Sequence, residues 1–130
     1  MLLFILGAAG FTLAEYAVHR WLLHGLSLSY LDHRHHHAMP DDYAIGWSVP
    51  AIAVSIATLT AVLWSITFGA GVLLAWGWYA YVHWRVHHRP FPRASLLFFL
   101  QRHHENHHRL ARRNFGVSTT WWDVILRTRT

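Results

Sequence analysis

The chain of 130 residues contains no cysteine and no lysine, and only six of its residues are acidic. Without cysteine it forms no disulfide, no thiolate-ligated zinc site, no iron–sulfur cluster and no covalently attached haem. Its eleven basic residues are all arginine, and the formal net charge is +5. Such a charge suits nucleic acid or anionic lipid headgroups. No recognition helix or RNA-binding motif accompanies the arginines, so we expect a membrane partner and no nucleic acid.

Charged residues are missing from long stretches of the chain, which is 54% hydrophobic. Residues 1–22 form one apolar block that is long enough, as a helix, to cross a bilayer core of about 30 Å. A secretory signal peptide is the alternative, but the basic n-region is absent. Residues 47–84 form a second block without Asp, Glu, Lys or Arg. Its length fits two spans, with a bend expected near residues 67–71, where glycines interrupt the block.

These blocks predict an all-α integral membrane protein with a single domain over residues 1–130. About three transmembrane helices are expected, at about residues 1–22, 47–66 and 69–88, and residues 25–46 and 89–130 would form a His-rich cap. The first helix is expected to run through His24 and to end at Gly25 in a left-handed cap. Ser95 is expected to begin the last helix. Three crossings place every histidine and arginine on one side of the membrane, which the positive-inside rule makes cytoplasmic.

Histidine is the residue in excess, with thirteen copies. Imidazole is neutral near pH 7 and is the commonest protein ligand for iron, zinc and copper. Most of the histidines lie within five residues of another, which on a helix can place them on one face. The groups are His19 and His24; His33, His36 and His37; His83 and His87; and His104, His107 and His108. One zinc or iron ion does not use so many ligands, so two metal ions are predicted.

A His-rich surface tract is the alternative for any one group, but four groups at one membrane face favour a metal centre. Residues 103–108 are expected to be helical, with His104, His107 and His108 converging on one point and His103 facing partly away. Glu15, one turn before His19, is expected to accept that imidazole N–H. A metal transporter would need ligands along the membrane path, and residues 47–82 contain no His, Asp, Glu or Cys.

Five ordered motifs carry a resemblance to a known family. They are Glu15-Tyr16-x-x-His19-Arg20-x-x-x-His24, His33-x-x-His36-His37, His83-x-x-x-His87, His104-x-x-His107-His108 and Phe115-Gly116-Val117-Ser118-Thr119-x-Trp121-Trp122-Asp123. Over residues 15–123 the chain resembles the fatty-acid hydroxylase and sterol desaturase superfamily. Among its branches the chain is most similar to the fatty acid 2-hydroxylases.

The resemblance implies a membrane non-haem di-iron oxygenase that uses dioxygen to hydroxylate a C–H bond of a lipid, a fatty acyl chain before others. The implied ligands of two iron ions are His19, His24, His33, His36, His37, His83, His87, His104, His107 and His108. The motifs leave out His35, His88 and His103. Glu15, Asn106 and Asp123 are expected to support the ligands from outside. Recombinant protein is expected to accept zinc, because the Irving–Williams order favours zinc over iron(II).

Dioxygen chemistry of this kind needs two external electrons, and the sequence shows no haem, flavin or cluster motif. A separate cytochrome or ferredoxin donor is therefore expected, docked on the arginine-rich face. Carotenoid hydroxylases share the His motifs and remain an alternative, although the segment from Phe115 to Asp123 favours the fatty-acid branch. A sterol or lipid desaturase is another, because both reactions begin with the same hydrogen abstraction. A non-catalytic metal-binding membrane protein is the remote alternative.

Overall fold

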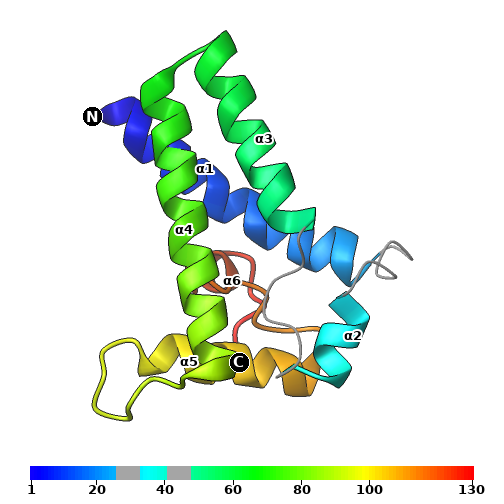
Figure 1. The fold of residues 1–130 in the computed structure, drawn as a ribbon. Helices are drawn as coiled ribbons and strands as arrows, with labels where there is room; N and C mark the ends of the chain where they lie inside the picture. The colour runs from blue at the N-terminus through cyan, green and yellow to red at the C-terminus, as the bar shows by residue number, and fades with distance from the viewer. Residues whose placement is uncertain (26–32, 41–47) are drawn as a thin grey trace.

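The computed structural model describes residues 1–25, 33–40 and 48–130, and this part of the chain contains helices and no strand (Figure 1). Most of the predicted cap segment 25–46 lies outside the described residues. The elements are α1 (Leu2–Ala17), the π-helix η1 (Val18–Leu23), α2 (His33–Ala38), α3 (Ser48–Leu63), α4 (Ile66–His88), α5 (Phe98–Leu110) and α6 (Trp121–Ile125). The predicted all-helical fold is confirmed.

The long helices α1, α3 and α4 form one bundle, in which α4 packs against both others. Figure 1 shows α3 and α4 side by side, with α1 crossing them and α5 lying across the end of α4. The connection between α3 and α4 is at one end of the bundle, and α2 and α5 are at the other. This arrangement brings η1, the histidine-bearing end of α4 and α5 together with α2.

Two glycines allow the close approach of α4 to its neighbours. A Cβ atom on Gly71 would overlap the carbonyl oxygen of Phe4 in α1. A Cβ atom on Gly69 would lie 2.9 Å from the carbonyl oxygen of Ala57 and 3.0 Å from the Cβ atom of Ala61, both in α3. Small residues at such crossings let helix backbones pack at short range.

The predicted bend at residues 67–71 is therefore wrong. The chain turns at Trp64 and Ser65, and the Oγ atom of Ser65 accepts a hydrogen bond of 3.3 Å from the Phe68 amide as the N-cap of α4. Glycine favours turns because it can adopt backbone conformations that other residues avoid. Here Gly69 and Gly71 stay helical, and the absence of a side chain allows the neighbouring helices to approach closely. Sequence alone does not separate these two roles.

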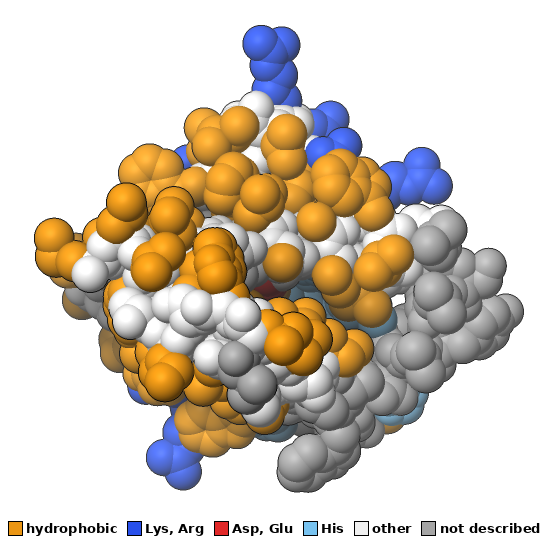
Figure 2. Space-filling model, turned by 90° about the horizontal axis from the view of Figure 1, so that it is seen from above, with side chains coloured by type: hydrophobic (Ala, Val, Ile, Leu, Met, Phe, Trp, Pro, Cys, Tyr) orange, Lys and Arg blue, Asp and Glu red, His pale blue; other side chains and the backbone are white. Residues whose placement is uncertain are grey.

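One helical stretch of the described residues, α1 with η1 over Leu2–Leu23, is long and apolar enough to cross a membrane by length and composition. Helix α3 has 16 residues, and α4 has 23 residues with Arg85 and several histidines near its end. The other two spans therefore remain predictions. Large hydrophobic side chains are exposed on all three helices, and Figure 2 shows them covering much of the face at the α3–α4 connection.

Two predicted helix ends are also corrected. Gly25 does not adopt the left-handed conformation, and no described glycine has a positive φ; a Cβ atom on Gly25 would instead overlap the carbonyl oxygen of Trp21. Helix α5 begins at Phe98 after Leu97, whereas the Oγ atom of Ser95 accepts from the Leu97 amide within the preceding turn. Leu97 and a buried cluster of Val82, Val86, Phe91, Leu100 and Val117 fix α5 against the end of α4.

Candidate metal centre

Nine of the ten predicted ligands form two groups of imidazoles, in each of which the ring nitrogens lie within 4.8 Å of one another. The first group consists of His19, His24, His33, His37 and His107, and the second of His36, His83, His87 and His104. The tenth, His108, places its Nε2 atom 3.0 Å from the Nε2 atom of His104, beside the second group. All ten predicted ligands are thus brought together at one end of the bundle.

The two groups meet because neighbouring histidines of one helix point into different groups. On α2, His36 belongs to the second group and His37 to the first. On α5, His104 belongs to the second group and His107 to the first. Residues three apart on an α-helix differ by about 60° in direction, so these side chains reach neighbouring points. The prediction that His104, His107 and His108 converge on a single point is wrong.

The π-helix η1 brings His19 and His24 onto one side of the chain. The His24 amide donates a hydrogen bond of 3.3 Å to the carbonyl oxygen of His19, five residues earlier. A π-turn is wider than an α-turn, so residues five apart lie near each other, and the two ring centroids are 5.2 Å apart. A regular α-helix would direct His24 away from His19.

The short nitrogen–nitrogen contacts between imidazoles of the groups join one Nε2 atom to another. In the first group, the Nε2 atom of His33 lies 3.2 Å from that of His19 and 2.8 Å from that of His24. The Nε2 atom of His107 lies 3.1 Å from those of His24 and His37. Each Nε2 atom carries either one proton or one lone pair, so these contacts cannot all be hydrogen bonds. A cation that accepts the lone pairs removes the conflict, and the donor set fits a metal ion.

The second group has the same character. The Nε2 atom of His83 lies 3.1 Å from that of His36, and the Nε2 atom of His104 lies 3.0 Å from those of His87 and His108. Among the described residues, the buried Nδ1 atoms of His83, His104 and His108 have no hydrogen-bond partner. The ring of Tyr79 stacks on His83 with the centroids 5.6 Å apart, a contact that the sequence did not indicate.

Two histidines of the first group have their outer nitrogens fixed by backbone carbonyls. The Nδ1 atom of His19 lies 2.5 Å from the carbonyl oxygen of Phe115, and the Nδ1 atom of His107 lies 2.8 Å from that of Arg113. A carbonyl only accepts, so each Nδ1 carries the proton and each Nε2 presents its lone pair. This is the tautomer that metal binding through Nε2 requires.

Burial keeps these imidazoles neutral. It lowers the pKa of His107 to about 3. Burial, together with the charges that His24 and His36 would carry, lowers the pKa of His37 to about 4. Removal from water disfavours the imidazolium ion, and crowded imidazoles repel when protonated. The lone pairs are therefore free at neutral pH.

The segment that supplies the Phe115 carbonyl is held by two carboxylates. Asp123, fully buried, accepts hydrogen bonds of 2.8 Å from the amides of Phe115 and Gly116. Glu15 accepts a hydrogen bond of 2.7 Å from the Val117 amide and others from Ser118. Glu15 therefore contacts His19 only through this segment, in contrast to the predicted direct hydrogen bond. The motif from Phe115 to Ser118 acts through its backbone amides and the Ser118 hydroxyl, and residue types alone do not reveal the backbone part.

Asp123 also joins the segment to the rest of the fold. Its carboxylate accepts a hydrogen bond of 2.7 Å from the Oγ1 atom of Thr128 and lies 3.0 Å from the Nε2 atom of His103. The hydroxyl of Tyr16 in α1 lies 2.8 Å from the same Oγ1 atom. Burial raises the pKa of Asp123, but hydrogen bonds led by that from His103 outweigh it and hold the pKa below its usual value.

The remaining candidates lie apart from both groups. His35 and His88 are exposed, and His103 is buried beside Asp123, so none of the three joins the imidazole groups. Asn106 is half-buried on the opposite face of α5, where it lines a pocket with His103. Asn106 therefore makes no side-chain hydrogen bond to the predicted ligands, all of which lie in the described part of the chain, in contrast to its expected supporting role.

Comparisons with known proteins identify the family. The fatty acid hydroxylase family model matches residues 4–128. The chain is 31% identical to a fatty acid 2-hydroxylase of Rattus norvegicus, in an alignment that covers 97% of the chain and 39% of the relative. It is 27% identical to a ceramide very long chain fatty acid hydroxylase, scs7, of Schizosaccharomyces pombe, with 96% and 41% covered.

A solved structure of full-length scs7p, in which only the hydroxylase domain is visible, superposes with a TM-score of 0.83 at 26% identity. The superposition covers 99% of the chain and 55% of that structure. The chain belongs to the fatty acid hydroxylase family, and the resemblance seen in its motifs is confirmed. It spans 39% and 41% of the lengths of the rat and fission-yeast relatives.

Proposed function

We propose that this chain is a membrane lipid hydroxylase whose ten clustered histidines hold two iron ions. The observation that carries the proposal is the convergence of Nε2 atoms in two adjoining groups, which hydrogen bonding among imidazoles cannot satisfy. His19, His24, His33, His37 and His107 would hold one ion, and His36, His83, His87, His104 and His108 the other. When bound, the irons supply the activation of dioxygen that inserting oxygen into an unactivated C–H bond requires.

The chain's own contribution is to orient the ligands and to keep water away from them. His104 and His107 are 1% and 0% exposed. The carbonyls of Phe115 and Arg113 hold the Nδ1 protons of His19 and His107, so both rings keep one tautomer. Burial of the imidazoles excludes the solvent that would compete with the substrate for a reactive oxidant.

A fatty acyl chain is the proposed substrate group. Figure 2 looks onto the end of the bundle opposite α2 and α5, and small areas of acidic and histidine side chains are visible there between hydrophobic side chains. An acyl chain that entered from this side would meet apolar walls before it reached the imidazoles. The rat relative is named a fatty acid 2-hydroxylase, which supports the same choice.

The proposed setting is a single membrane-embedded domain over residues 1–130. The exposed hydrophobic surface of α1, α3 and α4 supports three membrane spans, with the histidine groups and arginines at the cytoplasmic face. Electrons would come from a separate cytochrome or ferredoxin, because the reaction consumes two per turnover. The arginines at this end of the bundle suit an acidic donor.

The test compares cells that express the wild-type chain, His107→Ala and the control His35→Ala. His107 lies at the centre of the first group, whereas His35 is exposed and outside both. We expect about two metal ions per chain in the wild type and in His35→Ala, and a loss of about one in His107→Ala. Hydroxy fatty acids should appear with the first two proteins and disappear with His107→Ala.

Other outcomes separate the alternatives. Hydroxylated carotenoids in a carotene-producing host would identify a carotenoid hydroxylase, and new double bonds would identify a desaturase. Metal binding that depends on His107 without any lipid change in a host with a matching electron donor would identify a non-catalytic metal protein. Equal metal content in wild type and His107→Ala would contradict the ligand assignment.

A further inference from the structure

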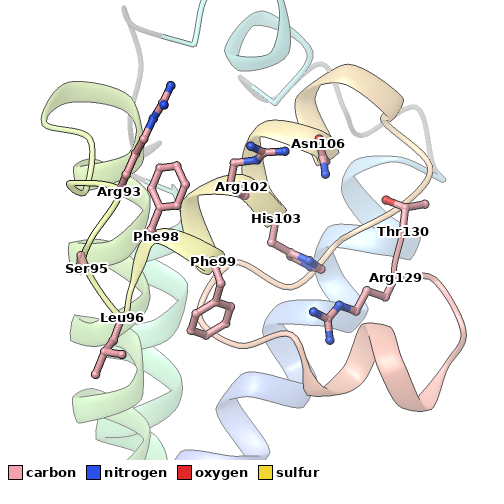
Figure 3. A pocket seen from close by; sticks show the side chains of 10 residues that line it. All are labelled: Arg93, Ser95, Leu96, Phe98, Phe99, Arg102, His103, Asn106, Arg129 and Thr130. Atoms are coloured by element: carbon pink, nitrogen blue, oxygen red, sulfur yellow. The ribbon is translucent and has the colours of Figure 1, made fainter.

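A pocket of about 460 Å³ lies on the face of α5 that points away from the histidine groups (Figure 3). Phe98, Phe99, Arg102, His103 and Asn106 line it from α5. The preceding connection and the C-terminal segment close its sides. The metal ligands of α5 occupy the other face of the same helix, so a molecule in this pocket would be separated from the metal centre by α5.

The pocket carries a concentration of unpaired positive charge. Arg93, Arg102 and Arg129 all line it, and none of their guanidinium groups has a hydrogen bond or an ion pair within the described part of the chain. By contrast, Arg113 donates to a backbone carbonyl and Arg20 to a tyrosine hydroxyl. No carboxylate side chain lines the pocket. The first turn of α5 adds the partial positive charge of a helix N-terminus.

Exposed hydrophobic side chains border the three arginines. Leu96 is 91% exposed and Phe99 is 51% exposed, and both line the pocket. Trp121 in α6 is 73% exposed, and Arg129 follows that helix. Arginines next to exposed aromatic and aliphatic side chains are typical of a surface at the headgroup level of a membrane. An acidic protein partner alone would not account for Leu96 and Phe99 beside the charges.

We propose that this pocket binds the phosphate group of an anionic phospholipid, with the lipid's acyl chains leaving past Leu96 and Phe99. Guanidinium groups bind phosphate oxygens in pairs, which suits three unpaired arginines around one cavity. The lipid is distinct from a substrate at the metal centre. The proposal rests on the membrane location given under the proposed function.

The test uses the full chain in nanodiscs of phosphatidylcholine with a minority of phosphatidylglycerol. After detergent extraction and purification, mass spectrometry gives the ratio of the two lipids retained per chain. The test variant replaces Arg93, Arg102 and Arg129 with Gln. The control replaces Arg89, Arg109 and Arg112 with Gln; these arginines are exposed and do not line the pocket. Each variant therefore loses three positive charges.

Phosphatidylglycerol should be enriched in the wild type and the control, and should fall to the bulk ratio in the test variant. The single substitution Arg102→Gln should weaken retention about fivefold, the effect of one basic residue near an anionic surface. Equal losses in both triple variants would show general attraction and overturn the proposal. Saturable binding of inorganic phosphate at these arginines, together with no enrichment of phosphatidylglycerol from the mixed nanodiscs, would also overturn it.

The test variant could instead lose binding of an acidic electron carrier while its enrichment of phosphatidylglycerol is unchanged. That result would assign the surface to a protein partner and overturn the proposal as well. Metal content and lipid hydroxylation, measured on the same preparations, report on the proposed function separately. The pocket and the histidine groups use opposite faces of α5, so loss of one does not require loss of the other.

Discussion

Removal of the Asp123 carboxylate should loosen the first histidine group although this residue contacts none of the proposed ligands. Its two oxygens accept from the amides of Phe115 and Gly116 and from Thr128, and lie 3.0 Å from His103. The carbonyl of Phe115 in turn meets the Nδ1 atom of His19. Asp123→Ala would leave these buried donors without an acceptor and free the carbonyl that orients His19.

The structure gives the size of the effect. Hydrogen bonds to a charged group contribute roughly 1.5–3 kcal/mol each, and bonds to one carboxylate are not additive. We expect Asp123→Ala to lower the free energy of unfolding by about 4 kcal/mol, a large share of the 5–15 kcal/mol typical of a domain. Asp123→Asn keeps one acceptor oxygen and should cost about half as much. Both variants should lose metal from the first group before the second.

The assay is denaturant unfolding in detergent, with metal content measured on the same samples. Glu105→Gln is the matched control, because Glu105 is exposed and accepts only from the side chain of Gln101. It should remain close to the wild type in both measurements. If Asp123→Ala lowered stability by less than about 1 kcal/mol and kept its full metal content, the assigned role of Asp123 would be refuted.

Three further predictions concern packing, pH and metal. Gly71→Ala should destabilise the bundle by roughly 2 kcal/mol, because its Cβ atom would overlap the Phe4 carbonyl. Gly77→Ala, where nothing lies within 4 Å, should keep or slightly raise the melting temperature, because alanine favours a helix interior more than glycine does. Metal-free protein should lose stability as the pH falls below about 6.5. The unfolded chain binds a proton at His107 near this pH, whereas His107 in the folded chain, with a pKa of about 3, stays neutral. This residue alone should contribute up to about 1.4 kcal/mol per pH unit, measured by unfolding at several pH values. Chelation should lower the melting temperature, and added iron or zinc should restore it.

The sequence alone was sufficient to predict which histidines gather at one end of the bundle. His83 and His87 lie one helical turn apart, and His104, His107 and His108 fall within two turns, so local geometry directs each set to one side of its helix. The exposed His35 and His88 fall outside these patterns, and the structure places both away from the groups. Apolar blocks of helical length likewise gave the all-helical architecture.

Local patterns did not determine how the helices meet. Gly69 and Gly71 lie in a composition that favours a turn, and only the positions of α1 and α3 show that they serve close packing. The π-turn that aligns His19 with His24 has no signature in a single sequence, because it differs from an α-turn by one carbonyl acceptor.

Tertiary structure also divided the predicted ligands between two groups. His36 and His37 are adjacent in sequence but join different groups, because α2 lies between the ends of η1 and α4, where each ring meets a different partner. The supporting carboxylates act through the segment from Phe115 to Ser118. Glu15 is 102 residues away from Val117 in the sequence, and Asp123 is eight residues away from Phe115. Spacing along one chain predicts which side chains share a helix face, whereas contacts between distant segments depend on packing that no local pattern records.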